Sequence, residues 1–153
     1  MKTKNILTIL LISIFSLTLE AANTYTIDQN YTISLTSGYV NGMSETWNVV
    51  STVTDKPIII TYSIGTENNY DYLTINNVDN SGNVTSQLLR ISGTKSGIVS
   101  TTIPNGRVQV VFTSDGSVCY ASNPSVYSGI NVTFSVNPNQ IVGNGLFVNG
   151  DSY

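Results

Sequence analysis

Apolar and polar residues alternate with a period of two along much of the chain after its first two dozen residues. Tyr25, Ile27, Tyr31, Ile33 and Leu35 share one parity and would lie on one face of an extended segment. β-Branched and aromatic residues, which strands favour, dominate the later apolar runs. These runs are Thr46–Val50, Pro57–Tyr62, Tyr72–Ile75, Gln87–Ile91, Gly97–Val99, Val108–Phe112 and Ile130–Val136. The pattern predicts an all-β chain built from short strands.

Residues typical of turns separate these runs, and no stretch after residue 22 has the period of an amphipathic helix. The turn segments include Ser37-Gly38, Asn80-Ser81-Gly82-Asn83 and Pro104-Asn105-Gly106. Short strands joined by such turns indicate an antiparallel β-sandwich or barrel of about eight to ten strands. We expect one domain over residues 23–137. Residues 138–153 are expected to form a tail, in which Leu146-Phe147-Val148 could add an edge strand.

The first 21 residues have the composition of an export signal. Lys2 and Lys4 precede an apolar run, Ile6–Leu19, and the small residues Ala21 and Ala22 follow it. The run is shorter than the roughly 20 apolar residues of a confident membrane span, and its flanks suit cleavage. We therefore expect a secreted mature chain with no membrane span.

Composition excludes several classes of function. Cleavage near residue 21 would leave four basic and eight acidic residues, hence a net charge of −4, which disfavours nucleic acid as a partner. The chain has no histidine, so a Ser-His-Asp triad, a Cys-His dyad and a histidine-rich zinc site cannot form. Cys119 is the only cysteine, which rules out an intrachain disulfide, and we expect its thiol to be buried or inert. We expect a protein that is not an enzyme.

Three triplets match the acceptor pattern for N-linked glycosylation. They begin at Asn30, Asn83 and Asn131. In a eukaryotic secretory pathway these positions could carry glycans. A chain rich in Asn and Thr also produces such triplets by chance.

Acidic residues gather in two of the predicted turns. Glu67 and Asp71 follow the run that ends at Tyr62, and Asp115 and Ser117 follow the run that ends at Phe112. Carboxylate and hydroxyl oxygens are the hard ligands that Ca²⁺ prefers, in sets of six to eight. Acidic residues in turns are more often solvated turn formers, so this composition alone does not indicate a metal site.

The order of several motifs resembles a CUB domain. The resemblance covers roughly residues 25–136, and its most specific part is the pair of segments YDYLTI and VVFTSD. The matching positions are Trp47, Tyr70–Ile75, Leu88–Gly93, Val108–Asp115 and Gly129–Val132. The resemblance implies an antiparallel β-sandwich of jelly-roll type that recognises proteins or glycans outside cells. Such domains usually have two disulfides, whereas Ser92 here stands at a cysteine position, so the chain resembles a divergent member that lacks disulfides.

The resemblance also implies a calcium site at one end of the sandwich. On the matching motif positions, the metal ligands would be Glu67, Asp71, Asp115 and Ser117. Tyr39, eight residues before the early tryptophan, matches the aromatic position that supports such a site.

Three functions are therefore open. The first is a recognition or adhesion module in which calcium orders the acidic loops, which then bind an extracellular protein that presents Lys or Arg. The second is a carbohydrate-binding β-sandwich without an essential metal, whose exposed Tyr and Asn side chains contact a glycan. The third is a glycosidase with paired carboxylates about 5–9 Å apart, which the small size of the domain disfavours.

Overall fold

The structure is a computed structural model that describes residues 23–27, 31–34, 38–53, 56–101 and 106–136. Its described part contains nine strands: β1 (Asn23–Ile27), β2 (Tyr31–Ser34), β3 (Ser44–Ser51), β4 (Ile59–Gly65), β5 (Tyr72–Val78), β6 (Val84–Ile91), β7 (Thr94–Ser100), β8 (Arg107–Thr113) and β9 (Gly129–Ser135). The expected export signal, the tail with Leu146-Phe147-Val148, and Asn30 lie outside the described residues. No helix in the described segments is long and apolar enough to cross a membrane.

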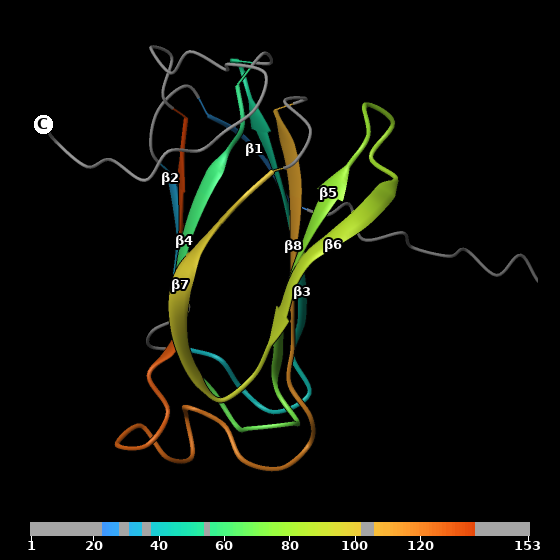
Figure 1. Ribbon diagram of the computed structural model, residues 1–153. Helices are drawn as coiled ribbons and strands as arrows, with labels where there is room; N and C mark the ends of the chain where they lie inside the picture. The colour runs from blue at the N-terminus through green and yellow to red at the C-terminus, as the bar shows by residue number, and fades with distance from the viewer. Residues whose placement is uncertain (1–22, 28–30, 35–37, 54–55, 102–105, 137–153) are drawn as a thin grey trace, which may run out of the picture.

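The strands form two sheets that face each other (Figure 1). A five-stranded sheet has the order β1-β3-β8-β5-β6, and a four-stranded sheet has the order β2-β9-β4-β7. All strand pairs are antiparallel except β1 with β3, which is parallel. The predicted all-β sandwich is confirmed.

The segment expected to run as one extended unit from Tyr25 to Leu35 is instead two strands in different sheets. β1 pairs with β3 in the five-stranded sheet, whereas β2 pairs with β9 in the four-stranded sheet. The polar triplet Asp28-Gln29-Asn30 interrupts the alternation between them. Parity predicts which face a side chain occupies, but it does not determine which strand becomes the neighbour.

The core lies between the sheets and follows the period of two. On β9, Ile130, Val132 and Phe134 face inward and have no exposed surface, while Asn131 between them is exposed. Burying a side chain of this kind stabilises a fold by about 1.5–3 kcal/mol. Cys119 is also buried, at 4% exposure, which confirms the expectation for its thiol.

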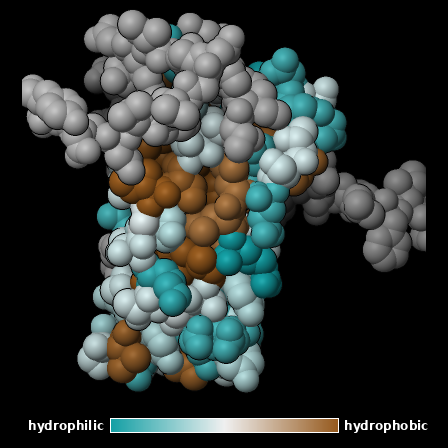
Figure 2. Space-filling view, viewed as in Figure 1, coloured by the Kyte–Doolittle hydropathy of each residue, from teal (hydrophilic) through white to brown (hydrophobic). Residues whose placement is uncertain are grey.

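Apolar surface remains along one side of the sandwich. β6 and β7 are edge strands of opposite sheets, joined through Ser92 and Gly93. Leu88, Leu89 and Val99 on these strands are half-buried and pack against the core. Figure 2 shows apolar surface between the two strands on this side of the molecule.

Two isoleucines test the assignment of the core. Ile60 on β4 has no exposed surface, so Ile60→Ala should lower the free energy of unfolding by about 2–5 kcal/mol. Ile98 on β7 is 69% exposed, and Ile98→Ala should change it by less than about 0.5 kcal/mol. Denaturant unfolding of both variants measures the difference. Equal losses would mean that the two sheets do not enclose Ile60.

Candidate metal centre

The pairing of β5 with β8 brings two acidic loops together. Tyr72, the first residue of β5, pairs with Thr113, the last residue of β8, so the chain enters β5 and leaves β8 at the same end of the sheet. Asp71 lies just before β5, and Asp115 lies two residues after β8. The connection from β4 in the other sheet adds Glu67 at this end of the sandwich, at the bottom of Figure 1.

The carboxylate of Asp71 joins the two loops. This side chain is fully buried. Its Oδ1 accepts a hydrogen bond from the Asp115 N–H at 3.0 Å, and its Oδ2 accepts one from the Glu67 N–H at 3.4 Å. The Asp71 N–H donates in return to the Glu67 carbonyl at 3.2 Å. One buried side chain therefore fixes the position of both loops.

Glu67, Asp71 and Asp115, here called the acidic cluster, each offer a carboxylate oxygen within 4.8 Å of the other two. At an effective dielectric constant of about 20, each such pair repels by roughly 3 kcal/mol. Among the described residues, no Lys or Arg side chain pairs with these carboxylates. The cluster therefore concentrates negative charge that the neighbouring side chains do not neutralise.

The hydroxyl of Ser117 lies between two members of the acidic cluster. Its Oγ is 2.8 Å from Asp115 Oδ1 and 3.1 Å from Glu67 Oε2. A hydroxyl has one proton, so it can donate to only one of these oxygens at a time. The Ser117 N–H also donates to Asp115 Oδ1 at 2.8 Å, which keeps the hydroxyl beside the carboxylates.

A third loop, which leads into β3, supports the Asp115 loop. The Gly42 N–H donates to the Asp115 carbonyl at 2.5 Å, and the Ser114 hydroxyl donates to the Val40 carbonyl at 2.6 Å. The Asn41 side-chain amide donates to the carbonyl of Ser117. All three bonds are accepted by backbone carbonyls, so they hold the Asp115 loop in place without using the carboxylates.

Tyr39, in the same loop, is fully buried beneath the cluster. Its ring meets Phe112 edge-on, with centroids 5.3 Å apart and planes at 79°. Burial, and then the nearby Asp71 carboxylate, raise the pKa of Tyr39 far above its ordinary value, so the hydroxyl stays protonated. That hydroxyl lies beside the Asp71 carboxylate but makes no hydrogen bond of ordinary geometry within the described segments. A buried hydroxyl rarely lacks a partner, and the Asp71 carboxylate is the acceptor beside it.

Hydrogen bonds connect Ser92 to the loop that carries Glu67. The Ser92 Oγ accepts from the Asn69 N–H at 2.9 Å and lies 3.3 Å from Asn68 Oδ1. Asn69 has a positive φ of 69°, a conformation that Asn tolerates better than most residues. Polar contacts therefore tie these two loops together at the position where the resemblance would place a disulfide.

All the candidate ligands taken from the sequence come together at this end, and Tyr39 joins them. The supporting roles of Asn41 and Ser114 were missed. Ser114 lies in the segment VVFTSD, of which only Asp115 was expected to serve the site. Asn41 belongs to no motif that predicts a role in the site. Two of the three glycosylation triplets lie elsewhere: Asn83 is exposed beside the β5–β6 turn, and Asn131 is exposed on β9.

Comparison with known proteins shows what this architecture is. No protein-family model and no curated protein sequence matches the chain. Solved structures do match. The crystal structure of the MASP-1 CUB2 domain bound to Ca²⁺ aligns with 74% of this chain and 97% of its own, at a TM-score of 0.57 and 17% identity. The protein has the CUB fold.

Larger structures agree with this assignment. The CUB1-EGF-CUB2 domains of rat MASP-1 align with 74% of this chain at a TM-score of 0.52 and 16% identity. The same three domains of human MASP-1/3 align with 71% at a TM-score of 0.50 and 18% identity. The chain spans 42% of each of these structures, but nearly all of the isolated CUB2 domain. At these identities the CUB likeness establishes the fold alone.

The buried Tyr39 hydroxyl gives a test of the site without its ion. In a chelator, Tyr39→Phe should leave the free energy of unfolding unchanged or raise it by up to about 1 kcal/mol, because the variant removes a buried hydroxyl that makes no hydrogen bond of ordinary geometry. Tyr72→Phe is the matched control. The Tyr72 hydroxyl donates to the Asn69 carbonyl at 3.1 Å, so its removal should cost about 0.5–1 kcal/mol. A clear loss of stability for Tyr39→Phe in chelator would show that the hydroxyl is already bonded.

Proposed function

We propose that this chain is a secreted, non-enzymatic recognition module whose protein-binding loops are ordered by one calcium ion. The ligands would be the acidic cluster and the Ser117 hydroxyl. The observation that carries the proposal is the Asp71 carboxylate, which is fully buried and has no cationic partner among the described residues. An isolated buried charge is costly, and a bound cation would offset that cost.

The donor set fits calcium better than the other common metal ions. Every candidate ligand atom is an oxygen, and the chain has no histidine with which to favour zinc. Ca²⁺ accepts six to eight oxygens in flexible arrangements, whereas Mg²⁺ demands near-ideal octahedral geometry. Three carboxylates with a hydroxyl supply a core of ligands that carbonyls and water could complete. The calcium bound to the MASP-1 CUB2 domain supports this choice.

Calcium would also stabilise the fold, by linking loops from both sheets. Glu67 follows β4 of the four-stranded sheet, while Asp71 and Asp115 flank strands of the five-stranded sheet. A ligand that binds only the folded state stabilises it by about 2.7 kcal/mol at a concentration of 100 Kd. Extracellular modules typically bind calcium with Kd values of about 10⁻⁴–10⁻³ M, which suits the secreted location expected from residues 1–21.

The charge that remains after calcium binding would determine the kind of partner. Three carboxylates and one Ca²⁺ leave a net charge of −1, so the filled site would still attract a cation. A Lys or Arg side chain from a partner could bond the carboxylate oxygens that calcium leaves free. Because the cluster is only partly exposed, such a pair would be stronger than an ordinary surface ion pair.

Recognition fits the site better than catalysis. The Asp71 carboxylate already accepts two backbone hydrogen bonds, and Ser117 lies between the other two carboxylates. The chain has no histidine that could act as a base and activate Ser117 as a nucleophile. The polar atoms of the site are therefore arranged to hold an ion.

Calcium binding is tested by calorimetry and thermal unfolding. We expect heat on titration with calcium, a higher melting temperature in calcium than in chelator, and a weaker response to magnesium. Asp115→Asn should lower calcium affinity at least about tenfold, since it removes a charged ligand. Tyr39→Phe should also weaken binding, because the hydroxyl lies beside the cluster.

Asp79→Asn is the matched control for this experiment. Asp79 lies in the β5–β6 turn at the opposite end of the sandwich, where its carboxylate accepts hydrogen bonds from the Ser81 and Asn83 N–H groups (Figure 1). Its replacement should leave calcium binding unchanged. If the unaltered protein gave neither heat nor a shift in melting temperature at millimolar calcium, the proposal would be wrong.

The nature of the partner is tested with a lysine-rich peptide and the same peptide after lysine acetylation. Binding to the immobilised protein should require calcium, because the ion orders the loops. It should weaken with added salt, which screens the charges, and disappear on acetylation, which removes the lysine charge. Surface plasmon resonance measures all three effects. Equal binding by the acetylated peptide would contradict a cation-binding surface.

A further inference from the structure

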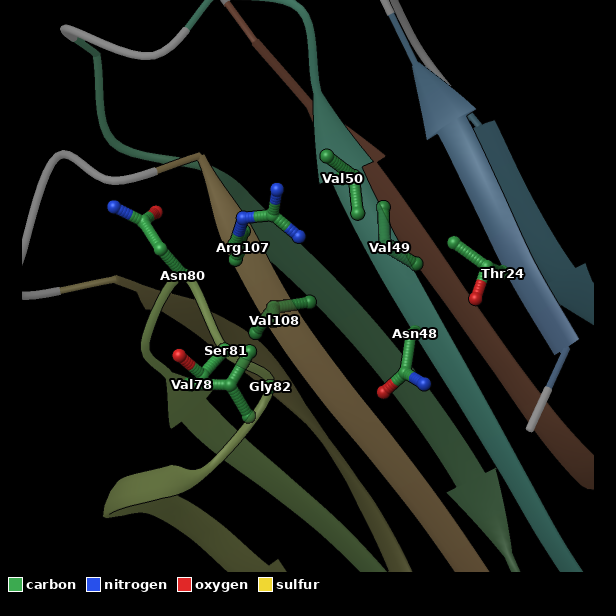
Figure 3. A pocket seen from close by; sticks show the side chains of 10 residues that line it. All are labelled: Thr24, Asn48, Val49, Val50, Val78, Asn80, Ser81, Gly82, Arg107 and Val108. Carbon is green, nitrogen blue, oxygen red and sulfur yellow. The ribbon is translucent and has the colours of Figure 1, made fainter. Parts of the chain in front are cut away.

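A polar hollow lies on the outer face of the five-stranded sheet, at the end away from the acidic cluster. It has a volume of about 140 Å³ and lies between the β5–β6 turn and strands β3 and β1 (Figure 3). Residues from five segments line it, among them Thr24, Asn48, Val50, Val78, Ser81 and Arg107. None of the lining residues belongs to the acidic cluster.

Irregular pairing of β5 with β6 builds one wall of the hollow. The register of the two strands shifts between Ile75 and Asn76 and again between Asn77 and Val78. Such bulges bend a hairpin and are common next to binding sites. Val78 is only 3% exposed although it lies on the outer face, so the bent hairpin covers this part of the sheet. The turn residues Asn80 to Gly82 then form the wall.

A row of side-chain amides crosses the sheet and ends at the hollow. Asn76, Gln109 and Asn48 are direct neighbours on β5, β8 and β3. The Asn76 amide donates to Gln109 Oε1 at 3.4 Å, and the Gln109 amide donates to Asn48 Oδ1 at 3.4 Å. The donating direction therefore runs toward Asn48. The Asn48 Nδ2 has no hydrogen-bond partner within the described ranges, and its side chain lines the hollow.

The side chains that line the hollow are chemically complementary to a sugar ring. Val50 and Val78 provide apolar surface, and the amides of Asn48 and Asn80 both donate and accept. Arg107 adds guanidinium donors for hydroxyl groups, and no carboxylate lines the hollow. A pyranose has the complementary features, since its C–H groups pack on apolar surface while its hydroxyls donate and accept. We propose that this hollow binds one neutral pyranose residue of a glycan, without calcium. The site is independent of the proposed metal centre.

Saturation-transfer NMR with a panel of neutral methyl pyranosides tests the proposal. At least one sugar of the panel should receive saturation from the protein, equally in calcium and in chelator. Asn48→Leu should lower its affinity about tenfold, which corresponds to the loss of one hydrogen bond. Ser81→Tyr, at an exposed turn position, should block the hollow without disturbing the core. This second variant keeps the test decisive if Asn48→Leu fails to fold.

Two controls separate this site from other surfaces. Thr61→Val exchanges an exposed hydroxyl on the other sheet for a methyl group and should retain sugar binding. Asp115→Asn should weaken calcium binding and retain sugar binding, so the two proposals can fail separately. The proposal is overturned if no neutral sugar binds, if binding survives both Asn48→Leu and Ser81→Tyr, if binding requires calcium, or if only sugars with a carboxylate bind.

Discussion

The buried carboxylate of Asp71 is the interaction on which the functional end of this protein depends. It accepts hydrogen bonds from the backbone of its own loop and of the loop that carries Asp115, 44 residues further along the chain, and it lies where β5 and β8 meet. Hydrogen bonds from backbone N–H groups partly compensate a buried carboxylate but carry no net charge. The remaining charge adds to that of Glu67 and Asp115, so negative charge is concentrated at this end of the sandwich.

Because the chain cannot form an intrachain disulfide, a bound cation would matter more for the stability of its fold. Ser92 and the Asn68-Asn69 pair form hydrogen bonds at the position where a CUB disulfide is expected. A hydrogen bond contributes about 0.5–1.5 kcal/mol net, whereas a disulfide typically contributes about 2–4 kcal/mol. Calcium at saturating concentration would contribute an amount similar to a disulfide, and it would act on the same group of loops. Its stabilisation would also depend on the calcium concentration outside the cell.

Much of the fold could be predicted from the sequence because parity and turn residues are local signals. Alternation identified the inward faces of β3, β8 and β9, and turn residues separated most strands. The division of residues 23–34 between two sheets and the parallel pairing of β1 with β3 depend on long-range contacts, which alternation does not encode. The candidate site, too, could be predicted only in part. Asp71 and Asp115 were identified through motifs, whereas the supporting bonds of Asn41 depend on how a third loop lies against theirs.

Two kinds of polar side chain lie at opposite ends of the sandwich. Charged oxygens gather where β8 ends, and neutral amides gather near the point where β8 begins. Between them the strand contributes Val108, Val110 and Phe112, which are fully buried. These three side chains carry no titratable group through which one end could influence the other, and distant changes in such a fold are usually additive. The two ends can therefore be studied separately, and a module that binds a cationic protein at one end could bind a glycan at the other.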